Sequence, residues 1–312
     1  MKVALLAGGV GGGRMADGFY QHCGPDLKVI VNTGDDFEMH GLSISPDLDS
    51  VLYTLAGISN VEQGWGLAQE TFSAHEMMGR LGMPDWFLLG DKDLGIHISR
   101  SHWLREGQSL TEVTARLAKG LGVAAVLLPM SDQKVSTWVE LADGRSLSFQ
   151  DYFVKRRHAD NVSGFTFKGI QAALPGVGVL PALQEAVAVI LAPSNPFVSI
   201  DPILKVAGVR DAITTTSKPR IAISPIIGGE ALKGPAGTML KDMGHETSCR
   251  GIAKYYEGLI DGIVIDTIDQ GYADSLQKAG LKVLCTDTIM RDPAGRSRLA
   301  SIVLHWLEED FL

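Results

Sequence analysis

Seven short apolar runs, spaced along the chain, constrain its fold more than any other feature. They occupy residues 2–7, 27–31, 123–128, 186–191, 220–223, 262–265 and 281–284. Each run is nearly continuous in hydrophobic residues, which is typical of a strand covered on both faces of a parallel sheet. Helical patterns follow most of the runs, so we predict an α/β fold with a mostly parallel sheet flanked by helices. We also expect a strand at residues 86–89 and helices at 67–80 and 111–121.

The pattern changes between about residues 130 and 180. Two segments of alternating apolar and polar residues, 136–141 and 146–154, flank the dipeptide Asp143-Gly144, and residues 164–168 alternate again. Asp-Gly is a common hairpin turn. A chain of 312 residues can form one large α/β domain or two smaller ones. Because no linker or repeat divides it, we predict one domain, residues 1–312, with a smaller mixed or antiparallel β insert at about 130–180.

A glycine-rich segment, residues 8–14, separates the first apolar run from a helical pattern at residues 15–22. Glycine lets the backbone approach a ligand closely and a helix N-terminus attracts anions, so Gly9, Gly11 and Gly12 are candidate phosphate-binding residues. Arg14 stands where the dinucleotide fingerprint has its last glycine, and Arg14-Met15 stands where the P-loop has Lys-Ser/Thr. The segment therefore excludes an ordinary dinucleotide dehydrogenase and a P-loop ATPase. A tight turn without a ligand is the alternative.

Five acidic residues gather between the second apolar run and the next helical pattern, with no Lys or Arg among them. They are Asp35, Asp36, Glu38, Asp47 and Asp49. Ligands of open α/β sheets bind at the carboxyl ends of the strands, so this position suits a functional site. Asp36, Asp47 and Asp49 are the candidate catalytic residues, with a cation or water to offset their charge. Pro46 before Asp47 also fits a helix start, where one carboxylate would act only as a cap.

A second acidic turn, at residues 90–93, opens another predicted helix. Asp93, His97 and Arg100 follow at spacings of four and three residues and therefore share one helix face. Together with Asp91 they are candidate ligands of an anionic or hydroxylated substrate. The alternative is an exposed face that carries an Asp93–His97 pair within the helix.

Two later loops carry short polar side chains beside prolines and glycines. Ser194 and Asn195 follow the run at 186–191, and Ser224 follows the run at 220–223. Proline restricts the backbone, which suits a loop that holds a ligand group in place, although turn chemistry explains part of this pattern. Lys233, in a glycine-bounded turn, is a candidate phosphate contact.

Charge and cysteine usage limit the partners of the chain. The formal net charge of −8 disfavours a general nucleic-acid binder, which needs a basic surface. Cys23, Cys249 and Cys285 lie far apart and in no Cys-x-x-Cys pair, so neither a disulfide framework nor a zinc site is expected. No apolar run has the length of a membrane span or a secretion signal. We therefore expect a cytoplasmic protein that uses small-molecule substrates and binds neither nucleic acid nor membrane.

Nine short motifs, in a fixed order, span nearly the whole chain. They are Gly8-Gly-Val-Gly-Gly, Val31-Asn-Thr-Gly-Asp-Asp, Ser45-Pro-Asp-Leu-Asp, Leu89-Gly-Asp-Lys-Asp, Leu128-Pro-Met-Ser-Asp, Phe149-Gln-Asp-Tyr-Phe, Pro193-Ser-Asn-Pro, Ser224-Pro-Ile-Ile-Gly-Gly and Lys233-Gly-Pro-Ala. In this order they resemble the 2-phospho-L-lactate transferase family, which builds the deazaflavin redox coenzyme known as factor 420.

The resemblance implies a Rossmann-like, magnesium-dependent enzyme that forms a homodimer. Its members transfer a phosphorylated small acid from a guanosine-diphosphate-linked donor to the deazaflavin Fo, which yields factor 420-0 or its dehydro or glyceryl analogue and releases GMP. The resemblance assigns Asp49 to the metal and the Fo end of the site, with Asp47 as a second candidate ligand, because Mg²⁺ prefers oxygen ligands. Asn32 and Thr33 become candidate substrate contacts. Relatives often carry Lys or Arg where this chain has Leu88, so one direct Fo contact is expected to be absent.

The donor and two rival functions stay open. The small acid is phospholactate, phosphoenolpyruvate or 3-phosphoglycerate, which differ by a few atoms. The main alternative function is a nonenzymatic nucleotide- or sugar-nucleotide-binding regulator of related fold, which the acidic turns at 47–49 and 91–93 disfavour because anion binding alone would not favour carboxylates. A nucleotidyltransferase is the other rival, and release of pyrophosphate instead of GMP would identify it.

Overall fold

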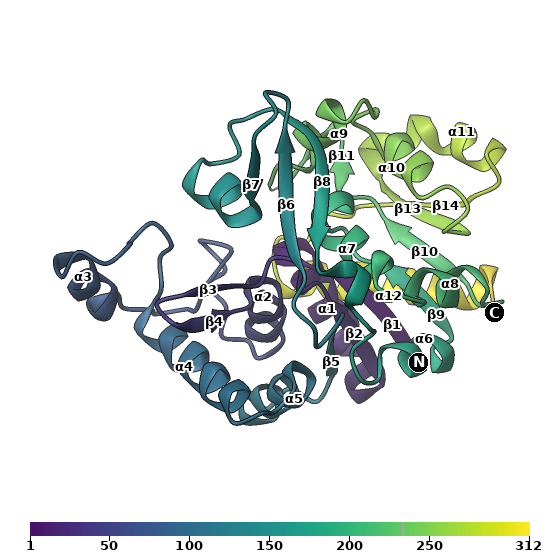
Figure 1. The fold of residues 1–312 in the computed structure, drawn as a ribbon. Helices are drawn as coiled ribbons and strands as arrows, with labels where there is room; N and C mark the ends of the chain where they lie inside the picture. The colour runs from purple at the N-terminus through teal and green to yellow at the C-terminus, as the bar shows by residue number, and fades with distance from the viewer. Residues whose placement is uncertain (233) are drawn as a thin grey trace.

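A seven-stranded parallel sheet forms the centre of the computed structural model, which describes residues 1–232 and 234–312 (Figure 1). From edge to edge the strands are β14 (Lys282–Thr286), β13 (Gly262–Asp266), β10 (Arg220–Ile223), β9 (Ala188–Leu191), β1 (Val3–Ala7), β2 (Leu27–Val31) and β5 (Val126–Pro129). Every neighbouring pair is parallel. Each strand overlaps one of the seven apolar runs, which confirms the predicted α/β fold.

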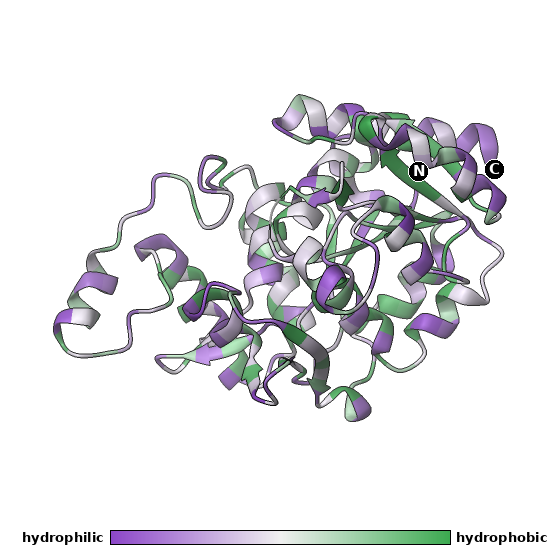
Figure 2. Ribbon diagram, turned by 90° about the horizontal axis from the view of Figure 1, so that it is seen from above, coloured by the Kyte–Doolittle hydropathy of each residue, from purple (hydrophilic) through white to green (hydrophobic). Residues whose placement is uncertain are grey.

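Alternation along the strands divides the interior into two cores, one on each face of the sheet. In β1, Val3, Leu5 and Ala7 point into one core, and Ala4 and Leu6 point into the other. The first core is closed by α1 (Gly9–Cys23), α2 (Pro46–Leu55), α5 (Leu110–Gly120) and α12 (Pro293–Asp310). The second is closed by α6 (Val179–Glu185), α7 (Asp201–Lys205), α8 (Val209–Thr214), α9 (Ala236–Asp242), α10 (Cys249–Tyr255) and α11 (Ala273–Lys278). Figure 2 shows the hydrophobic strands between these helices, as continuous apolar runs require.

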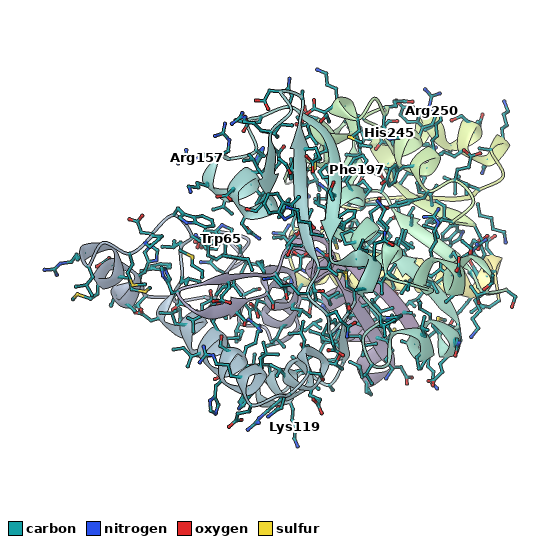
Figure 3. The ribbon with its side chains drawn as sticks, viewed as in Figure 1. Trp65, Lys119, Arg157, Phe197, His245 and Arg250 are labelled. Carbon is teal, nitrogen blue, oxygen red and sulfur yellow. The ribbon has the colours of Figure 1, made fainter. Side chains whose placement is uncertain are left out.

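The predicted β insert is a three-stranded antiparallel sheet in the order β7 (Ser146–Ser148), β6 (Ser136–Leu141) and β8 (Val162–Lys168). It stands on the second core, where the rings of Phe165 and Phe197 stack with their centroids 5.4 Å apart. Figure 3 labels Phe197 beside β8. The strand expected at 146–154 ends at Ser148, and a π-helical turn at Asp151–Lys155 follows it. Two short hairpins complete the strands: β3 (Phe37–Met39) with β4 (Leu42–Ile44), and β11 (Ile226–Ile227) with β12 (Glu230–Ala231).

An extended arm leaves the sheet between α2 and α4 (Asp91–Arg105), with α3 (Ser73–Arg80) near its tip (Figure 1). The helix expected at 67–80 forms only from Ser73 onward, and none of the side chains of α3 is buried. Among the residues described, no helix combines the length and hydropathy needed to cross a bilayer.

The prediction of a strand at residues 86–89 is wrong. These residues form no strand, and Leu89 is buried with Met39 and Ile44 in a small separate core. The side chains of Trp86 and Phe87 pack edge to face, with ring centroids 5.9 Å apart. The run is apolar because it forms this satellite core beside β3 and β4, which gives the same sequence signal as a strand.

Candidate active site

A cavity of about 860 Å³ lies at the carboxyl ends of the central strands. The chain passes from β1 to β2 and β5 on one side of the sheet, and later builds β9, β10, β13 and β14 on the other side. The connections diverge between β1 and β9, which is where ligands bind in open α/β sheets. The loops that follow β1, β2, β9, β10 and β14 all line the cavity. Its volume lies within the range of small-molecule sites.

The glycine segment enters this cavity as the start of a helix. α1 begins at Gly9, so the predicted glycine loop before residue 15 is wrong. A Cβ at Gly11 would lie 2.4 Å from the carbonyl oxygen of Pro193, and one at Gly12 would lie 2.8 Å from Ser194 Oγ. These glycines let α1 pack closely against the loop after β9. Gly9 and Gly11 line the cavity, whereas buried Gly12 does not.

The loops after β9 and β10 contribute three of the predicted polar residues to the cavity wall. Ser194 Oγ accepts a hydrogen bond from the Gly8 N–H at 3.2 Å and donates one to the Gly8 carbonyl at 2.8 Å, which ties the ends of β1 and β9 together. Asn195 Oδ1 accepts from the Phe197 N–H at 3.0 Å. Ser224 Oγ donates to the Ile226 carbonyl at 2.9 Å. Each therefore shapes its loop as well as lining the cavity.

Among the described residues, Asp35 and Asp47 are buried and form no ion pair with a basic side chain, whereas Asp36 is partly buried and is near enough to Arg100 to be affected by its charge. Burial, followed by the charges of Asp47 and Asp36, raises the pKa of Asp35 well above its usual value. Burial likewise raises the pKa of Asp36 well above its usual value, although Ser45 donates a hydrogen bond to it. Burial raises the pKa of Asp47 to about 6 despite hydrogen bonds from Asn32 and the Gly9 N–H. Asp35 and Asp47 line the cavity, but Asp36 does not.

Asn32 and Thr33 lie behind the cavity wall rather than in it. Asn32 is fully buried, and its Nδ2 donates to Asp47 Oδ2 at 2.9 Å and to the Val198 carbonyl at 3.1 Å. Its Oδ1 accepts from the Gly34 N–H at 2.8 Å. Because all its polar atoms are occupied, Asn32 positions Asp47. Thr33 is also buried, and its hydroxyl has no partner among the described residues.

The motifs at residues 45–49 and 89–93 contribute side chains to one buried network of hydrogen bonds and ion pairs. Arg100 donates to both oxygens of Asp49, with one contact of 3.1 Å from Nη1 to Oδ2. Arg100 Nη1 lies 3.1 Å from His97 Nδ1, which requires the proton of a neutral His97 to be on Nε2, 3.1 Å from Asp93 Oδ2. The Tyr53 hydroxyl donates to Asp93 Oδ1. Asp49 is thus already paired with a cation.

The electrostatics of this network follow from its pairing. Burial by itself would lower the Arg100 pKa. The charge of Asp49 and its hydrogen bonds outweigh this effect of burial, so the Arg100 pKa is raised. Burial also opposes ionisation of Asp93, but its interactions with His97 and Tyr53 lower its pKa. Asp49, Asp93 and His97 line the cavity, whereas Arg100 is 1% exposed and does not. The shared helix face predicted for Asp93, His97 and Arg100 therefore forms, with Arg100 acting behind Asp49.

Asp91, a predicted substrate contact, lies outside the cavity lining. Asp91 accepts hydrogen bonds from Thr71 Oγ1 at 2.6 Å and from the N–H groups of Ser73 and Ala74 at 3.1 and 2.9 Å. The Thr71 hydroxyl and these N–H groups lower the Asp91 pKa. Through these hydrogen bonds Asp91, at the start of α4, stabilises the position of the arm. It does not line the cavity. Lys233 lies outside the described residues.

Part of the cavity wall is apolar and aromatic, and sequence reasoning left most of this part out. It includes Trp65, Trp86, Phe149 and Phe153, together with Leu88. Trp65 is 45% exposed, and Figure 3 labels it below the insert, on the side from which α3 extends. The sequence motif at residues 149–153 could have identified Phe149 and Phe153 as residues of the cavity wall. Trp65 stands in no motif, so no sequence signal could have found it.

Further polar residues on the wall were also left out of the predicted site. Gln150 Nε2 donates to the Asp35 carbonyl at 3.0 Å, which joins the insert to the acidic stretch. Asp35 belonged to the acidic stretch, but only tertiary packing shows that it faces the cavity. Arg14, which excluded two nucleotide-binding fingerprints, also lines it.

The donor set fits a hard divalent cation in part. Within residues 1–232 and 234–312, no three acidic, histidine or cysteine side chains are already arranged around a metal position. However, Asp35 Oδ1 is buried without a hydrogen-bond partner among those residues, and Asp47 shares its wall. Mg²⁺ needs only one or two carboxylates because it keeps several water ligands. The unpaired carboxylates therefore suit such an ion, and Asp49 contributes only the lone pairs that Arg100 leaves.

The arrangement suits a transfer between two ligands. A polar wall of carboxylates, glycines and loop hydroxyls and an aromatic wall belong to the same cavity. A charged group that needs a cation fits the first wall, and a flat ring fits the second.

Comparisons with known proteins identify the family of the chain. The family model described as 2-phospho-L-lactate transferase CofD matches residues 3–302. A phosphoenolpyruvate transferase of Streptomyces griseus is 39% identical over 99% of each chain, and one of Thermobifida fusca is 40% identical over 96% of each. A 2-phospho-L-lactate transferase of Methanosarcina mazei is 36% identical over 96% of this chain and 98% of its own.

Solved structures show the fold alone. A crystal structure of a Bacillus halodurans protein of the UPF0052 family aligns with a TM-score of 0.64 at 16% identity, over 97% of this chain and 98% of that one. The family match covers nearly the whole chain, and the relatives align with it from end to end. The chain therefore belongs to the 2-phospho-L-lactate transferase CofD family of enzymes.

Proposed function

We propose that this enzyme transfers a phosphorylated small acid from a guanosine-diphosphate-linked donor to the deazaflavin Fo, forming a factor 420-0-type product and releasing GMP. The observation that carries the proposal is the match of a transferase family over residues 3–302 on a chain in which acidic and aromatic side chains line the same cavity of about 860 Å³. The aromatic wall would hold the deazaflavin ring, and the start of α1 would hold phosphate oxygens through its free N–H groups.

The reaction needs an aligned hydroxyl and a stabilised leaving group. In the proposed step the terminal ribityl hydroxyl of Fo forms a bond to the phosphorus that carries the acid. The bond from that phosphorus to the oxygen of GMP breaks, and GMP leaves with the electron pair. The proton of the hydroxyl passes to Asp35, which lines the cavity with an unpartnered Oδ1 and a raised pKa.

Magnesium is the cation we propose for the acidic wall. It would neutralise the charge on the phosphate oxygens during transfer. Asp47 and Asp49 would hold it, Asp47 through the carboxylate that Asn32 positions and Asp49 through the lone pairs left by Arg100. Asp36 would act from behind this wall, through the hydrogen bond that it accepts from Ser45 at the start of α2.

The donor acid is phosphoenolpyruvate-, phospholactate- or 3-phosphoglycerate-derived. The relatives divide between two of these names at similar identity, 39% for Streptomyces griseus and 36% for Methanosarcina mazei. We favour the enolpyruvyl donor by this narrow margin. Leu88 lies on the cavity wall, where it would offer Fo an apolar contact.

We further propose a homodimer in the cytoplasm. The arm exposes large apolar side chains, which are typical of a surface that contacts another chain. These are Val61, Trp65, Met77, Leu81, Met83 and Leu88. All three cysteines are free thiols, as expected in a reducing compartment. Sedimentation of the purified protein tests the dimer.

A mass-spectrometric transfer assay tests the function. Purified enzyme, Fo and magnesium receive the three guanylylated donors in competition. We expect GMP and one phospho-acyl deazaflavin, and loss of most of the product after removal of magnesium by a chelator. The variant Asp35→Asn should lower kcat by at least about 100-fold, because it removes the proposed proton acceptor.

The controls separate catalysis from folding. Asp49→Asn should also abolish transfer, but it leaves Arg100 buried with only one good acceptor, so its thermal unfolding is measured beside wild type. Asp143→Asn, which breaks an exposed aspartate–arginine pair, should leave transfer unchanged. Unmodified Fo with all three donors would overturn the transferase and leave the nucleotide-binding regulator. Release of pyrophosphate from GTP, supplied in a separate reaction, would indicate a nucleotidyltransferase.

A further inference from the structure

A narrow recess opens beside the main cavity, between α1, α2, α12 and the loop at residues 59–66. Its volume is about 20 Å³. Arg14 of α1 and Arg296 of α12 lie on its wall, and Tyr53 lines both the recess and the main cavity. Arg14 and Trp65 line both spaces, so the recess is a side pocket of the proposed active site.

Arg14 carries a charge that the protein leaves unpaired. Among residues 1–232 and 234–312, no carboxylate forms an ion pair with it and no acceptor takes a hydrogen bond from it. Burial, followed by the nearby charge of Arg296, lowers the Arg14 pKa. Two like charges placed together in a partly buried site oppose folding unless an anion offsets them.

Arg296 adds a second, independent indication of a ligand. Its side chain is 6% exposed, and Nη1 pairs with Asp17 Oδ2 at 3.1 Å. The Nε–H of the same guanidinium is buried and has no acceptor among the described residues. A buried N–H that lacks an acceptor costs about 1–3 kcal/mol, so such groups normally have a partner. Asp17 neutralises only one of the two arginines.

The size of the recess selects the chemical class of the anion. A volume of about 20 Å³ is little more than one water molecule occupies by the same measure. Because Arg14 and Trp65 line both spaces, a ligand in the main cavity needs to place only its end in the recess. A carboxylate can do so with two oxygens in a plane, whereas a substituted phosphate would bring a bulkier tetrahedral group. Guanidinium groups match that plane with paired N–H donors.

We propose that the recess formed by Arg14 and Arg296 binds the carboxylate of the small acid on the donor. This inference rests on the proposed function and names the subsite that recognises the acid. The three candidate acids all carry a carboxylate, so the arginine pair recognises what they share. Selection among them then falls to groups beside the recess, of which Ser50 lines both spaces.

The test compares donors with and without the carboxylate. The enolpyruvyl and lactyl donors are measured against the β-O-ethyl ester of GDP, which keeps the substituted diphosphate and lacks the acid. Binding is measured by calorimetry without Fo, on wild type, Arg14→Gln, Arg14→Lys and Arg296→Lys. Arg80→Gln, on exposed α3, is the matched control for loss of an arginine charge.

Wild type is expected to bind the acid donors about 10- to 100-fold more tightly than the ethyl ester, because a charge-assisted pair contributes on this scale. Arg14→Gln should erase that preference and leave ester affinity unchanged. Arg14→Lys should restore part of it, and Arg296→Lys, which keeps the charge but loses Nε–H, should reduce it. Arg80→Gln should behave as wild type.

Three results would overturn the inference. If Arg14→Gln weakens acid donors and ester equally, the arginine serves the diphosphate instead. If wild type binds the ester as tightly as the acid donors and still transfers the acid to Fo, the subsite is wrong and the proposed function stands. If wild type binds none of the guanosine compounds, the proposed function fails as well.

Discussion

At the scale of single residues, the acidic stretch combines two kinds of carboxylate that look alike in the sequence. Asp49 is matched by Arg100, fifty-one residues along the chain. Asp35 and Asp47 share the cavity wall without a basic partner, and burial raises the pKa of both. A protein retains such uncompensated carboxylates where function needs them, because burial of charge opposes folding.

The raised pKa of Asp47 predicts a pH-dependent stability for the ligand-free enzyme. Its folded-state pKa of about 6 lies above the ordinary value of 3.8, so the folded state binds more protons between these pH values. Stability from this group is present below about pH 4 and is lost as pH rises through about 6. The loss is about 3 kcal/mol for a shift of this size. Urea unfolding at intervals from pH 4 to 8 measures it.

The variant Asp47→Asn is the control, since it cannot ionise. The free-energy difference between wild type and variant should shift in favour of the variant by that amount between pH 4 and pH 7. Magnesium should reduce the shift in wild type, because the ion favours the charged carboxylate. Parallel pH profiles for the two proteins would show that Asp47 titrates normally.

At the scale of elements, the glycines of α1 act through packing. Gly11 faces the Pro193 carbonyl and Gly12 faces Ala7 and Ser194, so α1 lies unusually close to the ends of β1 and β9. This closeness brings Gly8 and Gly9 to the Asp47 carboxylate. The segment looked like a ligand-binding loop because both uses of glycine require a missing side chain.

Two helical glycines provide a matched test of this packing. Gly11→Ala places a methyl group 2.4 Å from the Pro193 oxygen and should destabilise the protein by at least about 2 kcal/mol. Gly95→Ala, within α4, meets nothing within 4 Å and should be neutral or stabilise by up to about 1 kcal/mol, since alanine favours a helix. Thermal and urea unfolding compare both with wild type. Equal effects of the two substitutions would contradict the packing argument.

At the scale of the whole molecule, one cavity joins parts that are distant in the chain. The start of α1, the acidic stretch, the arm, the insert and the loops after β9 and β10 all reach it. Gln150 of the insert donates a hydrogen bond to the Asp35 carbonyl. Ser194 is hydrogen-bonded to Gly8, from which it is separated by 186 positions in the sequence. A ligand that contacts several of these parts should therefore stabilise the molecule as a unit.

GDP provides the simplest test of that coupling. At 100 times its Kd, a ligand specific for the folded state adds about 2.7 kcal/mol of stability. For 312 residues this corresponds to a rise in Tm of about 4 °C. Differential scanning fluorimetry with GDP, and with ADP at the same concentration, measures the effect. A Tm that GDP leaves unchanged, or that ADP raises equally, would contradict a guanosine site in the cavity.

The sequence by itself determined the sheet, since a series of nearly continuous apolar runs that alternate with helical patterns is typical of parallel strands buried on both faces. It also determined the antiparallel insert, through alternation around Asp143-Gly144, and the helix that aligns Asp93, His97 and Arg100. These features depend on local periodicity, which residues carry with them. The prediction of a strand at residues 86–89 was wrong because a small satellite core requires the same kind of apolar residues as a buried strand.

Only the tertiary structure decided which side chains face the cavity. In the folded chain, Gly12, Asn32 and Asp36 lie behind the cavity wall. Trp65, Gln150 and Arg14 line the cavity. The tertiary structure also paired Asp49 with Arg100 and left Asp35 unpaired. Charge compensation and burial depend on residues that are distant in sequence, so no local pattern contains them. The chemistry of the site therefore depends on contacts that exist only once the chain has folded.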